Sequence, residues 1–173
     1  MKKKINKIKL LAMDVDGVLT DGIIALGNGQ DEEYKFFNEK DAAGLRMLIR
    51  AGIIPVIITG RSSNLVSNWA RGIGINDNDI YQKVFIKKEA LGKIIENHNI
   101  SKEEVAYIGD DLIDIGVLKR VGFAVAVENA VSEVKKEADY ITKKRGGEGA
   151  VREVIDLILK TQKKWIEVTE KYY

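Results

Sequence analysis

The sequence predicts a doubly wound, mostly parallel Rossmann-like sheet flanked by helices, and three observations support this α/β class. Short β-branched apolar runs alternate with longer amphipathic segments along the chain. The run at 53–60 is apolar throughout, as in strands that are buried on both faces. Two further runs, at 8–15 and 104–111, end in aspartates. The carboxyl ends of parallel strands meet at one edge of a sheet, where ligands bind, so these aspartates are expected to lie together.

The first half of the chain contains two expected strands, a hairpin and two helices. IKLLAMDV at 8–15 is the first strand, and residues 22–37 carry two short apolar arms around the turn signal GNGQ, which indicates a β-hairpin. A helix is expected over 41–52, where apolar residues share one face and a glycine ends the segment. After the strand at 53–60, Ser62 or Ser63 is expected to cap a helix that runs to about residue 71.

The second half continues the alternation. A short segment, DIYQ, leads into an amphipathic helix, KKEALGKIIENHN. The remaining elements are expected in the order strand 104–111, helix 112–122, strand 123–127, helix 131–138, strand 138–142 and, after a glycine-rich turn, a last helix within 146–164. No linker divides the chain, so residues 1–173 are expected to form a single domain with a tail at 161–173.

Composition excludes several classes of function. Twenty-eight basic and 26 acidic side chains leave a net charge of +2, too little to indicate a nucleic-acid partner. The basic opening MKKKINKIK lacks the apolar stretch of a signal peptide and is expected to be a solvated segment. No apolar run is long enough for a membrane span, and the absence of cysteine excludes thiolate zinc sites, so a cytoplasmic location and no membrane partner are expected.

Three strand ends carry the polar groups of a candidate site. These are the pair Asp14 and Asp16, the stretch Thr59-Gly60-Arg61, and the pair Asp110 and Asp111. Several carboxylates brought together repel one another unless protons or a cation intervene. Mg²⁺ binds one or two carboxylates together with water and phosphate oxygens, so it is the expected cofactor. The single histidine, His98, lies in a polar helix and is expected to have a structural or surface role.

Paired aspartates also suit phosphoryl transfer. One carboxylate can attack phosphorus and form an aspartyl phosphate, while the other protonates the leaving group and later activates water. The transferred group needs positive charge around its oxygens, which a metal, a lysine and backbone N–H groups supply. Each motif alone is weak evidence of function, but their joint placement after apolar strands favours this chemistry.

These motifs resemble those of the haloacid dehalogenase superfamily of phosphatases. DVDGVLTDG matches the first motif of that superfamily, ITGR the second and GDDLID the fourth, with a lysine motif in FIKKEAL. The resemblance covers about residues 8–160. Together with AGLRML, the YQ before the lysine motif, and GGEGAVREV, it extends to the capless family that hydrolyses 3-deoxy-D-manno-octulosonate 8-phosphate, a step in lipopolysaccharide precursor synthesis.

The resemblance implies a role for each matching residue. Asp14 would be the nucleophile and Asp16 the general acid and base. Mg²⁺ would bind the Asp14 carboxylate, the Asp16 main-chain carbonyl and Asp110, with Asp111 in support. Thr59, next to Gly60, would hydrogen-bond the phosphoryl group. Lys87 would pair with the phosphoryl charge, with Lys88 as its rival, and Asp114 would be either a support for the site or an ordinary acid of a helix first turn.

The resemblance also implies an assembly. The hairpin at 22–37 is far too short for the cap domain that many relatives carry, and capless relatives form tetramers in which a neighbouring subunit helps to enclose the pocket. The hairpins would then build the homo-oligomer, and GGEGAVRE would reach an adjacent active site. Read without the resemblance, these glycines form a flexible turn. The aromatic residues Trp165, Tyr172 and Tyr173 would let the tail dock on another subunit, whereas an ordinary chain end frays.

Substrate choice depends on a second anionic group. A phosphorylated sugar acid carries a carboxylate, which Arg61 is placed to recognise, although a surface arginine at a helix start is the alternative. The sequence departs from the family pattern at Lys40 and Ala42, where relatives often carry Arg and Gly, and at Lys83, where they carry a small residue. These changes leave room for a nine-carbon sialic-type sugar acid 9-phosphate.

Two other classes of function remain as alternatives. A phosphoaspartate receiver also uses Asp, Thr and Lys on a doubly wound sheet, but its phosphorylated aspartate follows a later strand. A catalytically silent sugar-phosphate binder would not need Asp16 beside Asp14.

Overall fold

Six strands form one sheet in which every pairing is parallel. The structure is a computed structural model that describes residues 1–27 and 33–172. The strand order is β5-β4-β1-β6-β7-β8. The strands are β1 (Leu10–Met13), β4 (Ile54–Ile58), β5 (Ile80–Tyr81), β6 (Val105–Gly109), β7 (Phe123–Ala126) and β8 (Tyr140–Ile141). The α/β class and the parallel sheet predicted from the sequence are confirmed.

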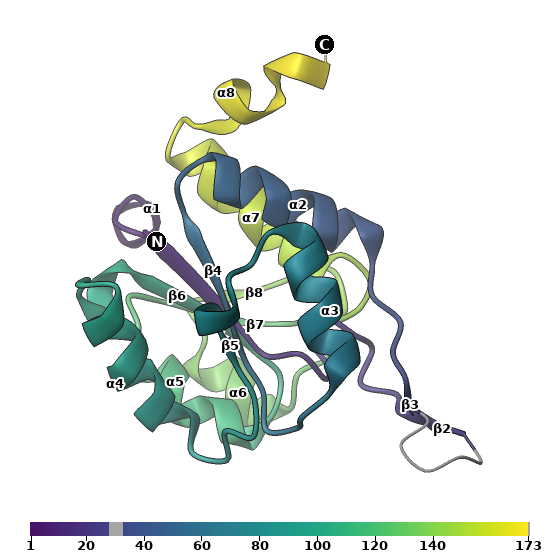
Figure 1. Ribbon diagram of the computed structural model, residues 1–173. Coiled ribbons are helices and arrows are strands. Elements are labelled where there is room, and N and C mark those ends of the chain that lie inside the picture. The colour runs from purple at the N-terminus through teal and green to yellow at the C-terminus, as the bar shows by residue number, and fades with distance from the viewer. Residues whose placement is uncertain (28–32, 173) are drawn as a thin grey trace.

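Helices cover both faces of this sheet, as Figure 1 shows. One layer contains α2 (Glu39–Arg50), α3 (Asn64–Ile73) and α7 (Ala150–Thr161), and the other contains α4 (Lys87–Asn97), α5 (Ile115–Leu118) and α6 (Ser132–Glu137). The remaining helices are α1 (Lys2–Ile5), α8 (Trp165–Thr169) and the short 3-10 helices Asp77–Asp79, Lys102–Glu104, Leu112–Asp114 and Glu170–Tyr172. Every residue of β1 is fully buried. A strand with neighbours on both sides and helices on both faces has no solvent-facing position, which explains its continuous apolar run.

The hairpin insert lies between β1 and α2. Its strands, β2 (Ala25–Leu26) and β3 (Glu33–Tyr34), pair antiparallel, so the predicted hairpin is confirmed with arms of two residues each. Residues 28–30 of the predicted GNGQ turn lie outside the described residues. The insert projects from the body of the molecule (Figure 1), and no cap domain is present in the described parts of the chain. Phe37 stacks on Trp69 of α3 with ring centroids 4.2 Å apart, which anchors the end of the insert.

The element boundaries differ from the sequence-based expectations in small ways. The first strand spans four residues of the expected eight, Leu10–Met13, although the flanking Lys9 and Asp14 still form backbone hydrogen bonds to the neighbouring segments. Ser63 precedes α3 as expected, but its side chain makes no capping hydrogen bond. The basic opening segment is not simply solvated: it forms α1 and buries Ile5. His98 ends α4, and its Nε2 lies 2.7 Å from Asp79 Oδ1, a structural contact.

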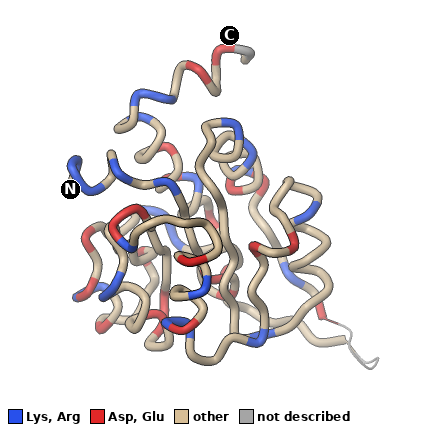
Figure 2. Tube along the Cα trace, turned by 60° about the vertical axis from the view of Figure 1, so that its left-hand side comes forward, with Lys and Arg blue, Asp and Glu red and all other residues tan. Residues whose placement is uncertain are grey.

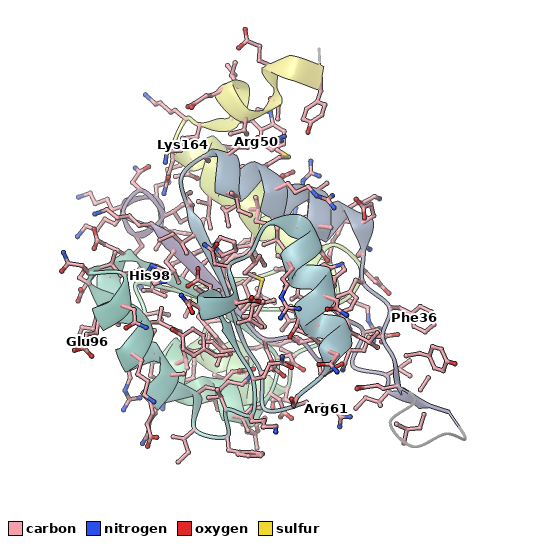
Figure 3. The ribbon with its side chains drawn as sticks, viewed as in Figure 1. Phe36, Arg50, Arg61, Glu96, His98 and Lys164 are labelled. Atoms are coloured by element: carbon pink, nitrogen blue, oxygen red, sulfur yellow. The ribbon has the colours of Figure 1, made fainter. Side chains whose placement is uncertain are left out.

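The tail folds back on its own chain. Lys164 Nζ donates to the carbonyl of Ala51 at 2.8 Å, and Val168 of α8 is buried. Arg50 of α2 donates to the hydroxyl of Tyr172 at 3.0 Å. Figure 3 labels Arg50 and Lys164 where the tail meets the body. Tyr173 lies outside the described residues.

Acidic and basic positions are interspersed along the described trace (Figure 2). Among the described residues, none of the helices has the length and apolar character required to span a bilayer.

Candidate active site

The carboxyl ends of β1, β4 and β6 bring the predicted motifs together. Met13 of β1 lies between Ile57 of β4 and Ile108 of β6 in the sheet register. The next residues out along these strands therefore emerge at the same edge. Asp14, Thr59 and Asp110 are the residues that the sequence placed there, and the strand order explains why three distant motifs share one site.

Asp14 and Lys87 form the centre of this edge. Asp14 is 5% exposed, and its Oδ1 accepts a hydrogen bond from the Val15 amide at 2.7 Å. Lys87, the first residue of α4, places its Nζ 2.7 Å from Asp14 Oδ2 and is itself buried. Lys88 is exposed. Of the two lysines left open by the sequence, the structure therefore brings Lys87 into the carboxylate cluster.

Asp114 is a structural centre of the same cluster, a role that the sequence left undecided. Its Oδ1 accepts from Lys87 Nζ at 2.7 Å and from the Tyr107 hydroxyl at 2.6 Å. Its Oδ2 accepts from the backbone N–H groups of Asp110 and Asp111 at 2.9 and 3.2 Å. Both oxygens are occupied, so Asp114 orients Lys87 and the loop that carries Asp110. Tyr107 was missed, although a tyrosine in a buried strand needs a partner for its hydroxyl.

The charges of the cluster are unbalanced. Burial raises the pKa of Asp14 to about 6, because the attraction of Lys87 only partly offsets the loss of hydration, and the charge of Asp114 raises the pKa further. Burial, followed by the charges of Asp114 and Asp14, raises the pKa of Asp110 to about 7. One lysine thus faces three aspartates, and additional positive charge would stabilise their ionised forms.

The donor atoms fit a hard divalent cation. Asp14, Asp110 and Asp114 each offer a carboxylate oxygen within 4.8 Å of the others. Asp110 Oδ1 is buried and makes no hydrogen bond within the described structure. Asp114 accepts four hydrogen bonds, whereas Asp14 accepts one from the Val15 amide and pairs with Lys87. Asp110, with its unpartnered Oδ1, is therefore the best placed ligand, followed by Asp14. A Cβ on Gly17 would lie 2.0 Å from Asp110 Oδ2, so a glycine is required beside this carboxylate.

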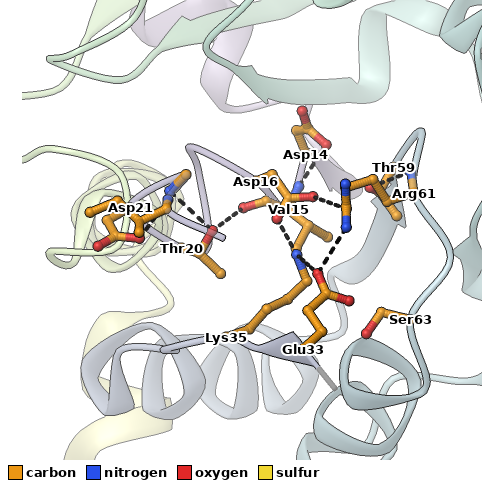
Figure 4. Close-up of polar contacts among 12 residues, drawn as sticks. Asp14, Val15, Asp16, Thr20, Asp21, Glu33, Lys35, Thr59, Arg61 and Ser63 are labelled. Atoms are coloured by element: carbon orange, nitrogen blue, oxygen red, sulfur yellow. Dashed lines mark hydrogen bonds and ion pairs between the residues drawn. The ribbon is translucent and has the colours of Figure 1, made fainter. Parts of the chain in front are cut away.

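Asp16 faces a second group of charges, drawn in Figure 4. Its Oδ1 pairs with Lys35 Nζ, and its Oδ2 lies 4.0 Å from Arg61 Nε. Glu33 lies between the two cations, with Oε1 at 3.0 Å from Lys35 Nζ and 3.3 Å from Arg61 Nη2. Glu33 and Lys35 were not recognised as site residues, although residues two apart in a strand share a face and both are near the hairpin.

The second motif supplies a buried hydroxyl and a half-exposed guanidinium. Thr59 is 3% exposed, and its Oγ1 accepts from the Arg61 amide at 3.3 Å across Gly60. Arg61 extends towards the hairpin, as Figures 3 and 4 show. Asp111 is exposed, and its carboxylate accepts from the Leu112 amide at 2.7 Å, which caps the short helix Leu112–Asp114. It lies outside the carboxylate cluster found among the described residues, so its supporting role stays a prediction.

The glycine-rich segment before α7 packs on the loop that follows β1. The Gly147 amide donates to the Val18 carbonyl at 3.0 Å. A Cβ on Gly146 would lie 1.7 Å from the Gly17 carbonyl oxygen, and one on Gly147 would lie 2.5 Å from the Asp21 amide nitrogen. The glycines are therefore close-packing residues of their own subunit and not a free turn. Their reach to an adjacent active site stays a prediction.

The doubly wound sheet, with its aspartate pair after β1 and its buried lysine, defines a haloacid dehalogenase-like hydrolase. The model of the haloacid dehalogenase-like hydrolase family matches residues 76–155. The 3-deoxy-D-manno-octulosonate 8-phosphate phosphatase of Escherichia coli K12 is 45% identical over 161 residues, which cover 93% of this chain and 84% of the relative. The chain belongs to this family of hydrolases, and it is a phosphatase.

Solved structures agree with this assignment. A 3-deoxy-D-manno-octulosonate 8-phosphate phosphatase from Moraxella catarrhalis, solved with magnesium, phosphate and KDO, is 41% identical and superposes with a TM-score of 0.95 over 99% of this chain and 97% of that chain. The cobalt-bound phosphatase from Haemophilus influenzae is 32% identical, with a TM-score of 0.89 over 94% of each chain. Metal ions thus occur in two similar proteins, and the acidic cluster of this chain fits a metal.

Proposed function

We propose that the protein is a Mg²⁺-dependent phosphomonoesterase that hydrolyses 3-deoxy-D-manno-octulosonate 8-phosphate to the free sugar acid and phosphate. The observation that carries the proposal is the buried Asp14, held by Lys87 and lying beside the unpartnered Asp110 oxygen. The phosphatase relatives at 45% identity support the choice of substrate. Within a lipopolysaccharide-producing cell, this reaction would supply a precursor sugar.

The residues divide the reaction between two steps. An Asp14 carboxylate oxygen attacks phosphorus, the bond from phosphorus to the sugar oxygen breaks, and Asp16 gives a proton to the departing alkoxide. Asp16 then takes a proton from water, which attacks the aspartyl phosphate and releases phosphate with Asp14 restored. Lys87 and Thr59 hold the phosphoryl oxygens, together with the backbone N–H of Gly60.

A magnesium ion would be held by the Asp14 carboxylate, the Asp16 main-chain carbonyl and Asp110, with Asp111 nearby. When bound, it would supply positive charge that offsets the repulsion among the carboxylates and the charge of the phosphoryl group. The raised pKa values of Asp14 and Asp110, about 6 and about 7, support this assignment, because a cation favours their ionised forms.

Substrate choice within this reaction class rests on Arg61, which would bind the sugar carboxylate. A nine-carbon sialic-type sugar acid 9-phosphate is the second candidate, since Lys40, Ala42 and Lys83 depart from the family pattern. Lys83 has a φ of +58°, a left-handed conformation that favours glycine, so a lysine is an uncommon residue at this position.

The proposal extends to assembly and location. Residues 1–173 would act as one capless domain with a tail at 161–173, in a cytoplasmic homotetramer built through the hairpins. The exposed apolar side chains of the insert support an interface there: Ile23, Leu26, Tyr34 and Phe36 are 68%, 75%, 55% and 72% exposed.

The first test is phosphate release from a panel of sugar phosphates with Mg²⁺ and with EDTA. The panel contains the eight-carbon and nine-carbon sugar acid phosphates, hexose phosphates and an aryl phosphate. We expect metal-dependent turnover with preference for the eight-carbon acid. Preference for another substrate would keep the mechanism and replace the specificity, whereas metal binding without any turnover would favour a silent binder.

The matched variant is Asp14→Asn, which keeps the size of the side chain but cannot attack phosphorus. We expect a loss of turnover of at least about 1,000-fold, since removal of a catalytic nucleophile costs up to about a million-fold in other enzymes, with an unchanged circular dichroism spectrum. Asp77→Asn, at an exposed ion pair with Arg71, is the control. Full activity of Asp14→Asn would exclude the aspartyl-phosphate route.

A further inference from the structure

Four charged side chains form a closed ring at the mouth of the site. The charge ring consists of Asp16, Glu33, Lys35 and Arg61, which come from the loop after β1, from the hairpin and from the segment after β4. Each cation lies near both carboxylates (Figure 4). When Asp16 is ionised, two positive and two negative charges balance, so the ring is neutral as a unit.

Glu33 is the member of the ring that has no part in the proposed chemistry. Its Oε1 is shared by Lys35 Nζ at 3.0 Å and Arg61 Nη2 at 3.3 Å. Burial alone would raise the pKa of Glu33, but the hydrogen bond and charge of Lys35 and the charge of Arg61 outweigh it and lower the pKa. The two cations thus hold an ionised carboxylate from two directions, beside the proposed general acid.

This geometry is that of an occupied carboxylate-binding site. The Lys35 side chain is 1% exposed, so its ammonium is oriented by its partners and not by bulk water. Arg61 offers a planar group suited to carboxylates and is 48% exposed, which leaves it open to a ligand. If the Glu33 carboxylate moved away, two cations would face only Asp16, and the ring would carry an uncompensated positive charge.

We infer that Lys35 and Arg61 together form the receptor for the carboxylate of the sugar acid, and that Glu33 occupies this receptor as a built-in competitor in the free enzyme. The inference rests on the proposed function, to which it adds Lys35 as a substrate-binding residue and Glu33 as a specificity element.

Specificity follows from charge balance. A sugar acid phosphate replaces the Glu33 carboxylate with its own, so the exchange leaves the net charge of the ring unchanged. A neutral sugar phosphate cannot make this exchange. If Glu33 stays in place, the sugar cannot occupy the position of the Glu33 carboxylate. If Glu33 is displaced, Lys35 and Arg61 have only the Asp16 carboxylate as a partner. The enzyme therefore discriminates in two ways: sugar acids gain an ion pair with Lys35 and Arg61, and neutral sugars leave these cations without a second carboxylate.

Binding of the free sugar acid tests the receptor without relying on turnover. Calorimetric titration in Mg²⁺ would compare 3-deoxy-D-manno-octulosonate with its methyl ester, which lacks the charge. For Glu33→Gln, we expect the acid to bind about 3- to 10-fold more tightly than to the wild type, in the range of a partly exposed ion pair, and the ester to bind unchanged. Glu39→Gln, at an exposed pair with Arg46, is the control and should match the wild type.

Lys35→Gln is the reciprocal variant. We expect it to weaken binding of the acid at least 10-fold and to leave the ester unaffected, with a circular dichroism spectrum that shows an intact fold. Weaker or unchanged acid binding by Glu33→Gln, or unchanged acid binding by Lys35→Gln, would overturn the inference.

The outcome separates this inference from the proposed function. If the wild type hydrolyses the sugar acid phosphate but Glu33→Gln binds the free sugar acid no more tightly, Glu33 is not a competitor, and the proposed function stands. If the wild type turns over only other phosphates, the proposed substrate is wrong, and the same variants are titrated with acetate and acetamide. Tighter acetate binding by Glu33→Gln would then still support a carboxylate receptor, and equal binding would overturn it.

Discussion

Asp111 and Asp114 lie three residues apart, but their carboxylates have different surroundings. Asp111 is exposed and caps a short helix through the Leu112 amide. Asp114 is fully buried, and its two oxygens accept four hydrogen bonds, including those from Lys87 and Tyr107. Sequence position alone does not distinguish the two acids, whereas burial does, because a buried carboxylate must be fully partnered.

We therefore expect Asp114→Asn to be severe. The amide would direct N–H groups at backbone donors or at Lys87, and the lysine would lose one of its two anions. The free energy of unfolding should fall by about 3 kcal/mol, as when one partner of a buried pair is removed, and turnover should fall about 10- to 100-fold. Urea denaturation and phosphate release measure the two effects.

Asp111→Asn is the matched control for stability. Asparagine caps a helix as well as aspartate does, so the change in unfolding free energy should stay within about 0.5 kcal/mol. Equal destabilisation by both variants would contradict the assigned role of Asp114.

Asp41 is a buried acid outside the proposed chemistry. Its Oδ1 accepts from the Arg152 amide at the start of α7 at 2.7 Å, and its Oδ2 is buried without a hydrogen bond in the described structure. Burial raises its pKa from 3.8 to about 6, against the hydrogen bonds from the Arg152 and Gly149 amides. Asp41 thus joins the first turn of α2 to the beginning of α7.

This pKa predicts a pH dependence of stability. Between pH 3.8 and about 6 the folded state retains a proton that the unfolded state has released, so the contribution of Asp41 to stability is lost as pH rises. Asp41→Asn cannot ionise. Relative to the wild type, its unfolding free energy should improve by up to about 3 kcal/mol between pH 4 and pH 7.5. The unfolding free energies of both proteins would be measured by urea denaturation across this pH range. If both changed with pH in the same way, Asp41 would not titrate between pH 4 and pH 7.5.

At the scale of elements, the glycine-rich segment links α7 to the loop that bears Asp16. Gly147 donates to Val18, and the Asn38 side chain at the start of α2 donates to the Gly147 carbonyl at 3.0 Å. Three elements that are far apart in sequence are thereby fixed to one another behind the site. The tail adds a similar clamp at the other end of α2 through Ala51.

Gly146→Ala tests this link. Its new Cβ would lie 1.7 Å from the Gly17 carbonyl, so backbone must shift, and we expect a loss of about 1–3 kcal/mol in unfolding free energy. Turnover should fall as well, because Gly17 directly follows Asp16. Thermal or urea unfolding and phosphate release would measure both losses.

Gly92→Ala, in the interior of α4, is the control. A Cβ there meets nothing within 4 Å, and the substitution should stabilise the protein by about 0.5–1 kcal/mol. If Gly146→Ala lowered neither the unfolding free energy nor turnover, the close packing before α7 would not position the loop that bears Asp16.

At the scale of the whole molecule, the insert presents exposed apolar side chains on a segment that projects from the body of the molecule (Figure 1). Phe36 is 72% exposed beside Phe37, which is anchored on Trp69, so the chain buries one aromatic ring and presents the other. Figure 3 shows Phe36 pointing away from the body. Exposed apolar groups in one projection favour burial against another copy.

We expect Phe36→Ser to shift the protein towards smaller species in sedimentation velocity, because it removes apolar area from the proposed interface. Ile166→Ser, at a residue 75% exposed on α8, is the control and should sediment like the wild type. A wild type that sediments as a monomer would refute the hairpin interface.

Much of the fold could be predicted because it depends on local patterns. The apolar runs of β1, β4 and β6 have no polar face, and amphipathic segments lie between them, so strand and helix were distinguishable along the chain. The polar residues after those strands needed only the parallel sheet to bring them together. Lys35 and Tyr107 were missed because a lysine in a hairpin and a tyrosine in a strand have ordinary local explanations.

The sequence by itself determined the class of sheet, the edge at which Asp14, Thr59 and Asp110 meet, and the chemistry that those groups suit. Tertiary structure decided that Lys87 and not Lys88 enters the site, that Asp114 orients it, and that Glu33 occupies the cations beside Asp16. Hydrophobic periodicity, which distinguishes strands from helices, is a property of neighbouring residues. The pairing of charges from separate elements depends on distances that only the folded chain sets.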